Sequence, residues 1–519
     1  MRRRRRVVSV NAGPRCLSGS LEQGLWPLVE SLLGSHDMAG LGVAVVREDE
    51  IVARGFGVRD VGTGVPVTPE TMFHLASVSK PFVATAIVSL ATGPYAGEPV
   101  LDLDAPIVDW IPELTLADGR AGEVTARRLL SHSSGLPDVA DYGWHDPQLG
   151  DDALSQFARS LSGWRLKSEP GSVFAYSNAG FELLGLLLSR VTGTTFENAV
   201  KQRVLTPLGM ENSTFLRGEV PAHLAASPHV GMPLKVPENA YPYSRRHAPS
   251  STLHSNLVEM CRWMVAHFQP SGVHAPADVV DPEGQWARLD AAMLDLMWQP
   301  VVPVEGSPWE DGAALGWSVG SYRGHRTVSH SGADPGFGSK MVLVPERRVG
   351  VVLLANCNTV PTGPLGRAAL DIALANGPVP EVRRAAPEEL EEGLAELRAL
   401  LPPVVGPVAR TLTTSGPDAA RAAYQRLAAQ DPAELDLDDD GFIDAVWGAI
   451  ELHRTSMVWP LLRLWTAVRP ESSAAWTMTG WAHQVDGHLG LARSHLLRAL
   501  QLDPENDEAA ELVSNLPSP

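Results

Sequence analysis

Cysteine, lysine and long apolar runs are all scarce in this sequence of 519 residues. The three cysteines, Cys16, Cys261 and Cys357, are odd in number and far apart, which argues against a disulfide-stabilised scaffold. Neither a Cys-x-x-Cys pair nor a His-Glu-x-x-His run occurs, so the sequence carries no common metal-binding motif. No run of about 18 apolar residues is present, so we predict no membrane-spanning helix.

Basic residues are also under-represented. The chain has 42 Lys plus Arg against 60 Asp plus Glu, and its formal net charge is −18. A nucleic-acid-binding protein needs a basic face that displaces counterions from phosphates, so we predict no nucleic-acid partner. The composition is 44% hydrophobic and 20% charged, which is ordinary for a globular protein and excludes wholesale disorder.

The N-terminus carries one basic run, the arginines at positions 2–6. Only Val7, Val8 and Val10 follow before polar residues resume, whereas a secretory signal has about 7–15 apolar residues at that point. We therefore predict a disordered tail over residues 1–19 and a cytoplasmic location. Export stays open if the gene start is misassigned.

Residues 20–375 are predicted to form one α+β domain. Strand-like runs occur at 42–46 and 51–57 and again at 315–322, 327–330, 341–344 and 349–354, while 76–270 is rich in helical patterns. Strands near both ends of the segment predict an antiparallel sheet flanked by helices, with a helical lobe formed by the middle. We expect a cleft where the lobe meets the sheet.

The rest of the chain is predicted to be helical. Residues 376–408 are rich in Pro, Glu, Arg and Ala and are interpreted as a linker, and 409–519 as helical repeats. Trp476, Gly480, Ala492 and Pro504 have the spacing of a helix–turn–helix unit of about 34 residues, and this unit resembles a tetratricopeptide repeat. A second unit directly upstream is degenerate. We predict a protein partner for these repeats, which bury their own apolar faces by stacking.

Three short motifs occur in order within residues 20–375: Ser-Val-Ser-Lys at 77–80, Tyr-Ser-Asn at 176–178 and His-Ser-Gly at 330–332. Ser77 directly precedes an apolar helical run, and Lys80 lies one turn later on the same face. A serine hydroxyl becomes a good nucleophile only when another group takes its proton. A buried lysine can do so and an arginine cannot, so a lysine at position 80 is informative in a chain with few of them.

With their surroundings, the three motifs resemble the serine β-lactamase and penicillin-binding-protein-like family, in particular its class C and esterase/D-aminopeptidase branch. The similarity spans about residues 20–375 and includes Leu-Leu-Ser-His-Ser-Ser-Gly-Leu-Pro at 129–137, Pro-Gly at 170–171 and Pro-Leu-Gly-Met at 207–210. The resemblance implies a β-lactamase-like fold and a serine hydrolase that acts through an acyl-enzyme. Its substrate would be a small molecule or peptide with an ester, amide or D-peptide bond, and no metal or other cofactor is implied.

The resemblance also implies the roles of three catalytic residues. Ser77 would be the acylated nucleophile and Lys80 its proton acceptor or electrostatic partner. Tyr176 would carry protons to and from the leaving group. These groups must converge on one carbonyl for acyl transfer to proceed.

Four further residues would bind the substrate. Asn178 would orient the acyl chain, and His330 would line the cleft. Gly332 precedes Ala333, whose backbone N–H would complete an oxyanion hole with that of Ser77. Many family members have Lys-Thr-Gly where this chain has His-Ser-Gly. Because histidine is only partly charged near neutral pH, it holds a substrate carboxylate less well than lysine, and we predict weak turnover of penicillins.

Two competing motifs are less favoured. Gly-Trp-Ser-Val-Gly at 316–320 fits the nucleophile elbow of α/β-hydrolases, but Ser318 lies within a β-rich run and no helix follows. Asp436, Asp438 and Asp440 imitate the start of a calcium loop, yet the twelfth position is Trp447 instead of a bidentate glutamate.

Two other functions stay open for the chain. An acyl- or peptidyl-transferase on the same scaffold would use an amine or alcohol in place of water. A non-catalytic binding module would act through the repeats alone. Because the predicted sheet is complete before residue 376, we expect a chain that ends near Pro403 to fold and to keep its ester activity.

Overall fold

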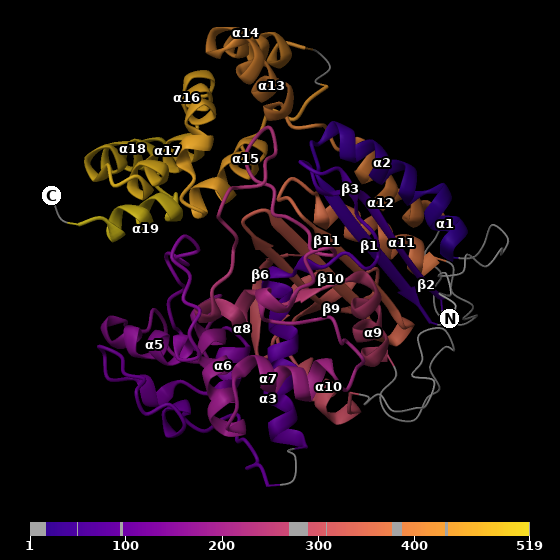
Figure 1. Ribbon diagram of the computed structural model, residues 1–519, viewed down its shortest axis with the longest axis vertical. Coiled ribbons are helices and arrows are strands. Elements are labelled where there is room, and N and C mark those ends of the chain that lie inside the picture. Colours follow the sequence, from indigo (N-terminus) through magenta and orange to yellow (C-terminus); the bar gives the residue numbers. More distant parts are fainter. Residues whose placement is uncertain are drawn as a thin grey trace.

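A nine-stranded antiparallel sheet forms the centre of the computed structural model (Figure 1), in the order β3-β2-β1-β11-β10-β9-β8-β7-β6. The structure describes residues 17–48, 50–93, 97–268, 289–307, 309–375, 387–430 and 434–517. The strands of this sheet are β1 (Gly40–Arg47), β2 (Glu50–Asp60), β3 (Val65–Pro66), β6 (Val302–Ser307), β7 (Glu310–Ala313), β8 (Ser318–Tyr322), β9 (His325–Asp334), β10 (Phe337–Val344) and β11 (Val349–Ala355).

The two ends of the domain meet in the middle of the sheet. Strand β1 pairs with β11 from Leu41 opposite Ala355 to Arg47 opposite Val349. Both strands are buried along their whole length, as expected for apolar strands that have helices on both faces. The antiparallel sheet and its flanking helices confirm the predicted α+β architecture. Strands β6 and β7 are not among the predicted strands.

Four helices cover one face of the sheet: α1 (Leu17–Gln23), α2 (Leu25–Ser35), α11 (Thr362–Ala375) and α12 (Pro387–Ala399). Leu17 is fully buried against this face, so α1 begins inside the segment 1–19 that the sequence assigned to an N-terminal tail. The arginine run and Cys16 lie outside the described residues. Helix α12 falls in the predicted linker, but Leu394 and Leu397 pack in the same apolar cluster, so this segment forms part of the layer.

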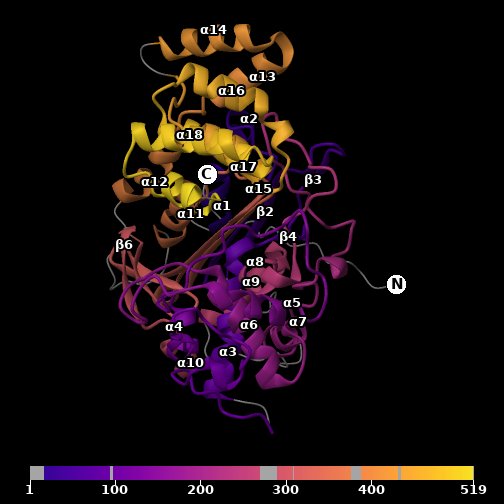
Figure 2. The ribbon, with the colours of Figure 1, turned by 90° about the vertical axis from the view of Figure 1, so that its left-hand side faces the viewer.

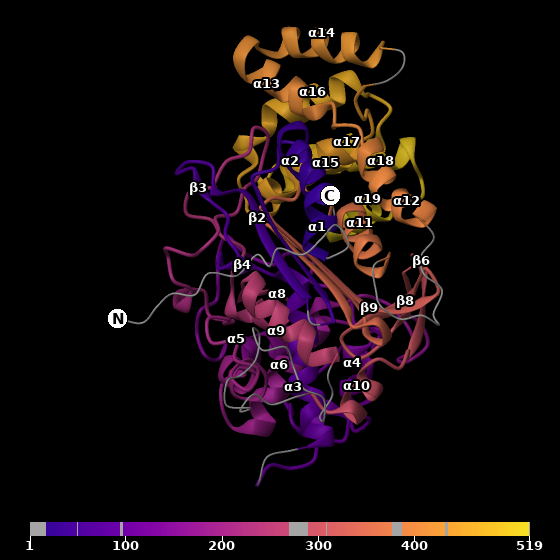
Figure 3. The same ribbon diagram turned by 90° about the vertical axis from the view of Figure 1, so that its right-hand side faces the viewer.

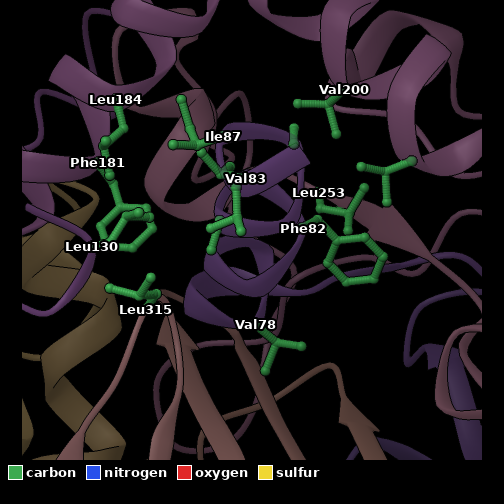
Figure 4. Close-up of a cluster of buried hydrophobic side chains, with 14 of the residues drawn as sticks. Val78, Phe82, Val83, Ile87, Leu130, Phe181, Leu184, Val200, Leu253 and Leu315 are labelled. Atoms are coloured by element: carbon green, nitrogen blue, oxygen red, sulfur yellow. The ribbon is translucent and has the colours of Figure 1, made fainter. Parts of the chain in front are cut away.

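The other face carries a helical lobe that surrounds α3 (Lys80–Thr92). Phe82, Val83 and Ile87 of α3 are fully buried, and Figure 4 shows them among side chains of several neighbouring segments. A helix that is apolar on all sides is stable only when other elements enclose it. The lobe also contains α4 (Ala126–Leu130), α5 (Ala153–Ser160), α6 (Asn178–Thr192), α7 (Phe196–Val200), α8 (Ala248–Ser251), α9 (Leu257–Phe268) and α10 (Ala291–Met297).

Among the described residues, seven α-helices make up the C-terminal part of the chain from Val405 onward, which we call the tail. In Figures 2 and 3 it lies above the sheet, while the lobe lies below. The helices are α13 (Val405–Ser415), α14 (Pro417–Ala428), α15 (Asp440–Glu451), α16 (Trp459–Val468), α17 (Ser473–Val485), α18 (Leu489–Leu502) and α19 (Asp507–Asn515). Among the helices of the described residues, none has both the length and the apolar character that a membrane span requires.

The tail packs against the α+β domain as well as on itself. Trp144 and Val230 of that domain are buried in the same apolar cluster as Phe442 and Trp465 of the tail. A Cβ atom on Gly448 would lie 2.9 Å from Val230 Cγ1, so α15 approaches the domain closely. The chain therefore covers part of the tail's apolar surface itself, and nothing in the described residues supports a separate protein partner.

Candidate active site

Ser77 lies at the junction between the sheet and the lobe. It belongs to a short 3-10 helix, η1 (Ala76–Ser79), that continues directly into α3. The preceding residue, Ala76, has a φ of 47° and so adopts the left-handed conformation that alanine normally avoids. Such a residue persists only where the surrounding structure fixes it, and it is common beside reactive groups. The N-terminal end of α3 also favours negative charge at Ser77.

Two polar side chains contact the hydroxyl of Ser77. Lys80 Nζ donates a hydrogen bond to Ser77 Oγ at 2.8 Å, and the hydroxyl of Tyr176 donates to the same oxygen at 2.9 Å. Lys80 is fully buried even though it carries an amine. The structure thus brings together the three residues that the sequence suggested for catalysis.

The amine of Lys80 has two more partners. It donates to Asn178 Oδ1 at 2.6 Å and to the carbonyl oxygen of Ser250 at 2.9 Å. Burial lowers the pKa of Lys80 to about 8, although the negative charges of Glu182, Asp138 and Asp334 act in the opposite direction. About a tenth of the lysine is therefore uncharged at pH 7 and can accept a proton.

Tyr176 differs from Lys80 in its electrostatics. Its ring stacks on His132, with 4.2 Å between the ring centroids, and 37% of its surface is exposed. Desolvation by the surrounding protein nevertheless raises the pKa of Tyr176 well above its usual value. The phenol keeps its proton at neutral pH, so Tyr176 acts as a hydrogen-bond donor to Ser77, and the available proton acceptor is Lys80.

Asn178 is the first residue of α6, and two side chains hold its amide. Its Nδ2 donates to Asp138 Oδ2 at 3.0 Å and to the oxygen of Tyr142. Its backbone N–H donates to Asp138 Oδ1 at 2.7 Å. With both amide hydrogens engaged in this way, the amide oxygen of Asn178 is directed toward Lys80.

Strand β9 supplies the opposite wall through the His-Ser-Gly motif. A Cβ atom on Gly332 would lie 2.7 Å from the backbone nitrogen of Ser77, so only glycine allows β9 to come this close to η1. His330 is buried, and its Nδ1–H donates to the carbonyl oxygen of Ser331 at 2.7 Å. Burial and the nearby Lys80 lower the pKa of His330 to about 3, so its ring is neutral at pH 7. Ala333 follows on the same strand.

The comparison with protein families matches this arrangement. The family model described as "Beta-lactamase" matches residues 27–375, which include η1, α6 and β9. The chain belongs to the β-lactamase family of serine hydrolases.

Individual relatives support the same assignment. Penicillin-binding protein 4 of Amycolatopsis lactamdurans is 30% identical over 334 residues, which are 63% of this chain and 83% of that protein. Esterase EstB of Burkholderia gladioli is 36% identical over 229 residues, which are 42% of this chain and 57% of the esterase. The solved structure of the octameric penicillin-binding protein homologue from Pyrococcus abyssi has a TM-score of 0.57 at 24% identity. That match covers 70% of this chain and 79% of the homologue, and it shows the shared fold.

Within this β-lactamase-family site, a buried network beneath Lys80 was not anticipated from the sequence. Glu182 Oε1 accepts hydrogen bonds from Ser250 Oγ at 2.6 Å and from His247 Nδ1 at 3.1 Å. All three side chains are buried. Because Ser250 also offers its carbonyl oxygen to Lys80, the network positions the amine and places a negative charge near it.

The sequence likewise did not predict that Asp138 and Tyr142 accept hydrogen bonds from the amide of Asn178. Asp138 directly follows the Ser-Gly-Leu-Pro turn of the family motif, and this position is the one signal that could have identified it. Tyr142 stacks on Trp144 at 5.1 Å between ring centroids. The segment 138–144 is therefore part of the site.

The two competing motifs have other structural settings. Ser318 begins strand β8, which pairs with β7 and β9 and is not followed by a helix. This does not fit a nucleophile elbow.

The acidic segment that imitates a calcium loop contains Asp439, which accepts hydrogen bonds from Trp465 Nε1 at 2.9 Å and from Ser472 Oγ at 2.7 Å. It therefore links helices within the tail.

Proposed function

We propose that this chain hydrolyses ester, amide or D-peptide bonds through an acyl-enzyme on Ser77. One observation carries the proposal: a fully buried lysine with a pKa near 8 lies 2.8 Å from the serine oxygen. An amine in this state can take the hydroxyl proton at neutral pH, which an ordinary surface lysine cannot do. The second hydrogen bond, from Tyr176, supplies a proton donor on the same oxygen.

Acylation would proceed by proton transfers that involve Ser77, Lys80 and Tyr176. Lys80 takes the proton from Ser77 Oγ as the oxygen bonds to the substrate carbonyl carbon, and the carbonyl oxygen becomes negative. The backbone N–H groups of Ser77 and Ala333 stabilise that charge. The bond to the leaving group then breaks as Tyr176 donates a proton to it, and the proton held on Lys80 restores the tyrosine. Water repeats the sequence on the acyl-Ser77 ester and releases the acid.

The substrate side of the site favours neutral groups. A β-lactam antibiotic presents a carboxylate, which a cationic side chain near the position of His330 would bind best. His330 is neutral at pH 7 because its pKa is about 3, so this contact is missing. Together with the relative named as an esterase, this supports an ester or amide substrate and the class C and esterase/D-aminopeptidase branch of the family.

Two finer assignments belong to the proposal. The order of α15 to α18 supports a tetratricopeptide-like tail, since α17 and α18 are joined by a short turn, and α15 and α16 by a segment that includes a 3-10 helix (Thr455–Met457). A transferase remains the alternative for the chemistry, because an amine or alcohol could replace water at acyl-Ser77. A product assay with added alcohol separates the two reactions, since a transferase forms a new ester and a hydrolase forms the free acid.

Covalent labelling tests the proposal directly. We expect a fluorophosphonate probe to add one label to the full-length chain and peptide mapping to place it on Ser77. Ser77→Ala should take no label and should lose several orders of magnitude in ester hydrolysis. Ser318→Ala is the matched control, and it should be labelled and active. Labelling of Ser318 in place of Ser77 would refute the proposal.

A further inference from the structure

A cluster of three metal-ligating side chains lies between the active-site segment and the tail. Asp141 and His145 belong to the loop that runs from Asp138 toward α5, and His453 follows the end of α15. His453 lies more than 300 residues later in the sequence than the other two. We propose that Asp141, His145 and His453 bind one divalent transition-metal ion, with Zn²⁺ as the best match, and that this ion joins the tail to the active-site loop.

The distances within the cluster fit a single ion. One ligand atom from each residue lies within 4.8 Å of those from the other two. His453 Nε2 and Asp141 Oδ2 are 3.9 Å apart, and the rings of His145 and His453 stack with 3.6 Å between their centroids. Ligand atoms around a tetrahedral zinc ion, with bonds of about 2.0–2.2 Å, lie about 3.3–3.5 Å from each other. The ligand atoms therefore need to move by roughly 1.5 Å at most. Because an imidazole nitrogen binds a metal in the plane of its ring, the two stacked rings also have to turn apart, and Asp141 and His145 are exposed while His453 is half-buried.

The ligand atoms are available for binding. Neither imidazole ring of the pair donates or accepts a hydrogen bond with any residue that the structure describes. Asp141 accepts a hydrogen bond from the backbone N–H of Gly143 at 2.7 Å through Oδ1, which leaves Oδ2 facing His453. The hydrogen bond to Oδ1 fixes the orientation of the carboxylate, and hydrogen bonds of this kind to metal ligands are common in metal sites.

The backbone around His453 is fixed against the domain. The guanidinium of Arg454 donates to the carbonyl oxygens of Glu238 and Asn239 at 3.1 and 3.4 Å. This contact holds the turn after α15 beside the loop that carries His145. The third ligand therefore reaches the cluster through the docking of the tail, and a detached tail would leave only two ligands.

The chemistry of the donors selects the metal. Two imidazole nitrogens and one carboxylate oxygen suit zinc and the neighbouring first-row ions, whereas calcium and magnesium prefer oxygen ligands alone. Three protein ligands leave a fourth position for water. Since Tyr142 lies next to Asp141 and accepts a hydrogen bond from Asn178, an ion here would steady the segment that holds Asn178.

Metal binding by the full-length, tag-free protein tests this proposal, and it does not depend on the reaction at Ser77. After dialysis against EDTA, we expect calorimetry to show about one equivalent of Zn²⁺ bound. The ion should raise the unfolding temperature by a few degrees, because a ligand that binds only the folded state stabilises it. Co²⁺ should give the visible absorption of a tetrahedral site.

Single substitutions identify the ligands. Loss of a residue that only hydrogen-bonds to a metal ligand typically weakens metal binding by about 10–100-fold. His145→Ala and His453→Ala remove ligands themselves, so each should weaken Zn²⁺ binding by more than this. Asp141→Asn should weaken it less, because the amide oxygen can still bind. His223→Ala, at an exposed histidine elsewhere, is the matched control and should bind as the parent does. Binding unchanged in both histidine variants, or no saturable binding by the parent, would overturn the proposal.

Discussion

The amine of Lys80 and the hydroxyl of Ser77 lie 2.8 Å apart, and the lysine is completely buried. Their spacing of three residues places them on one face of a helical turn. Burial then disfavours the charged amine and so lowers the pKa of Lys80. In the proposed mechanism this lowered pKa allows Lys80, which is normally a cation, to act as the base.

The pH dependence of kcat/KM should report this base. Because burial lowers the pKa of Lys80 to about 8, the active uncharged amine forms as the pH rises through 8. We expect kcat/KM for a short p-nitrophenyl ester to rise about tenfold per pH unit below 8 and to level off above it. A profile between pH 6 and 9, corrected for spontaneous hydrolysis, measures this. A midpoint near 6.5 would instead indicate a histidine as the base.

Lys80→Arg should abolish this activity, because an arginine keeps the charge and cannot accept the proton. Lys167→Arg is the control, since Lys167 is an exposed lysine on the surface. Activity retained by the first variant would contradict the assignment of Lys80.

Glu182 is expected to set the pKa of Lys80. Its buried carboxylate favours the charged amine and so partly offsets the effect of burial. Glu182→Gln removes the negative charge, while the amide oxygen can still accept the hydrogen bond from Ser250. The midpoint of the kcat/KM profile should therefore move below 8 by roughly 1 pH unit, at the lower end of the range for nearby charges.

The exposed Glu70→Gln variant should leave that midpoint unchanged. A purely structural role for Glu182 predicts a different result, namely lower stability with the same midpoint. Thermal unfolding measured beside the pH profile distinguishes the two roles.

Because the ring of His330 is neutral, we expect the enzyme to prefer substrates without a carboxylate. A hydrogen bond to a charged group is worth about 1.5–3 kcal/mol, which corresponds to roughly 10–100-fold in rate. We therefore expect kcat/KM for penicillins to lie below that for short p-nitrophenyl esters. His330→Lys should raise the ratio of penicillin to ester turnover. Penicillin turnover by the parent enzyme well above ester turnover would show that another cation binds the carboxylate.

Local patterns account for the parts of the site that could be predicted from the sequence. Ser77 and Lys80 lie within one helical turn, and Tyr176 and Asn178 lie within one motif, so their relation is short-range. Strands β1 and β11 are apolar along most of their length, and β2 and β10 each contain a shorter apolar run. Strand β7 was missed because Glu310–Ala313 contains Glu, Asp and Gly, and it forms through pairing with neighbours and not through its own pattern.

The remaining contacts depend on tertiary packing that no local pattern reveals. Glu182 meets Ser250 across the lobe, and Asp138 meets Asn178 only because a turn folds back on α6. The position of the tail is the largest example, since its helices could be predicted but its contact with Trp144 and Val230 could not. This contact changes what we expect of a truncated chain.

Removal of the tail should impair the enzyme, contrary to the expectation from the sequence alone. Truncation near Pro403 would expose Trp144 and Val230, which are buried against the tail. Trp144 stacks on Tyr142, and Tyr142 accepts a hydrogen bond from Asn178, which in turn contacts Lys80. A chain of contacts thus runs from the tail to the base, and displacement of a catalytic group by about 1 Å can reduce the rate roughly 100-fold.

Two variants separate loss of the tail from loss of the fold. The truncated chain tests the whole contact, through its soluble yield, unfolding temperature and kcat/KM for the ester. Gly448→Leu tests docking alone, because its side chain would collide with Val230 while both parts of the chain stay present. Gly490→Ala, at a helix position where a Cβ atom meets nothing within 4 Å, is the matched control. We expect lower ester activity in the truncated chain and in Gly448→Leu, and full activity in Gly490→Ala. Full activity in the truncated chain would show that the β-lactamase-like domain holds Asn178 in place without the tail.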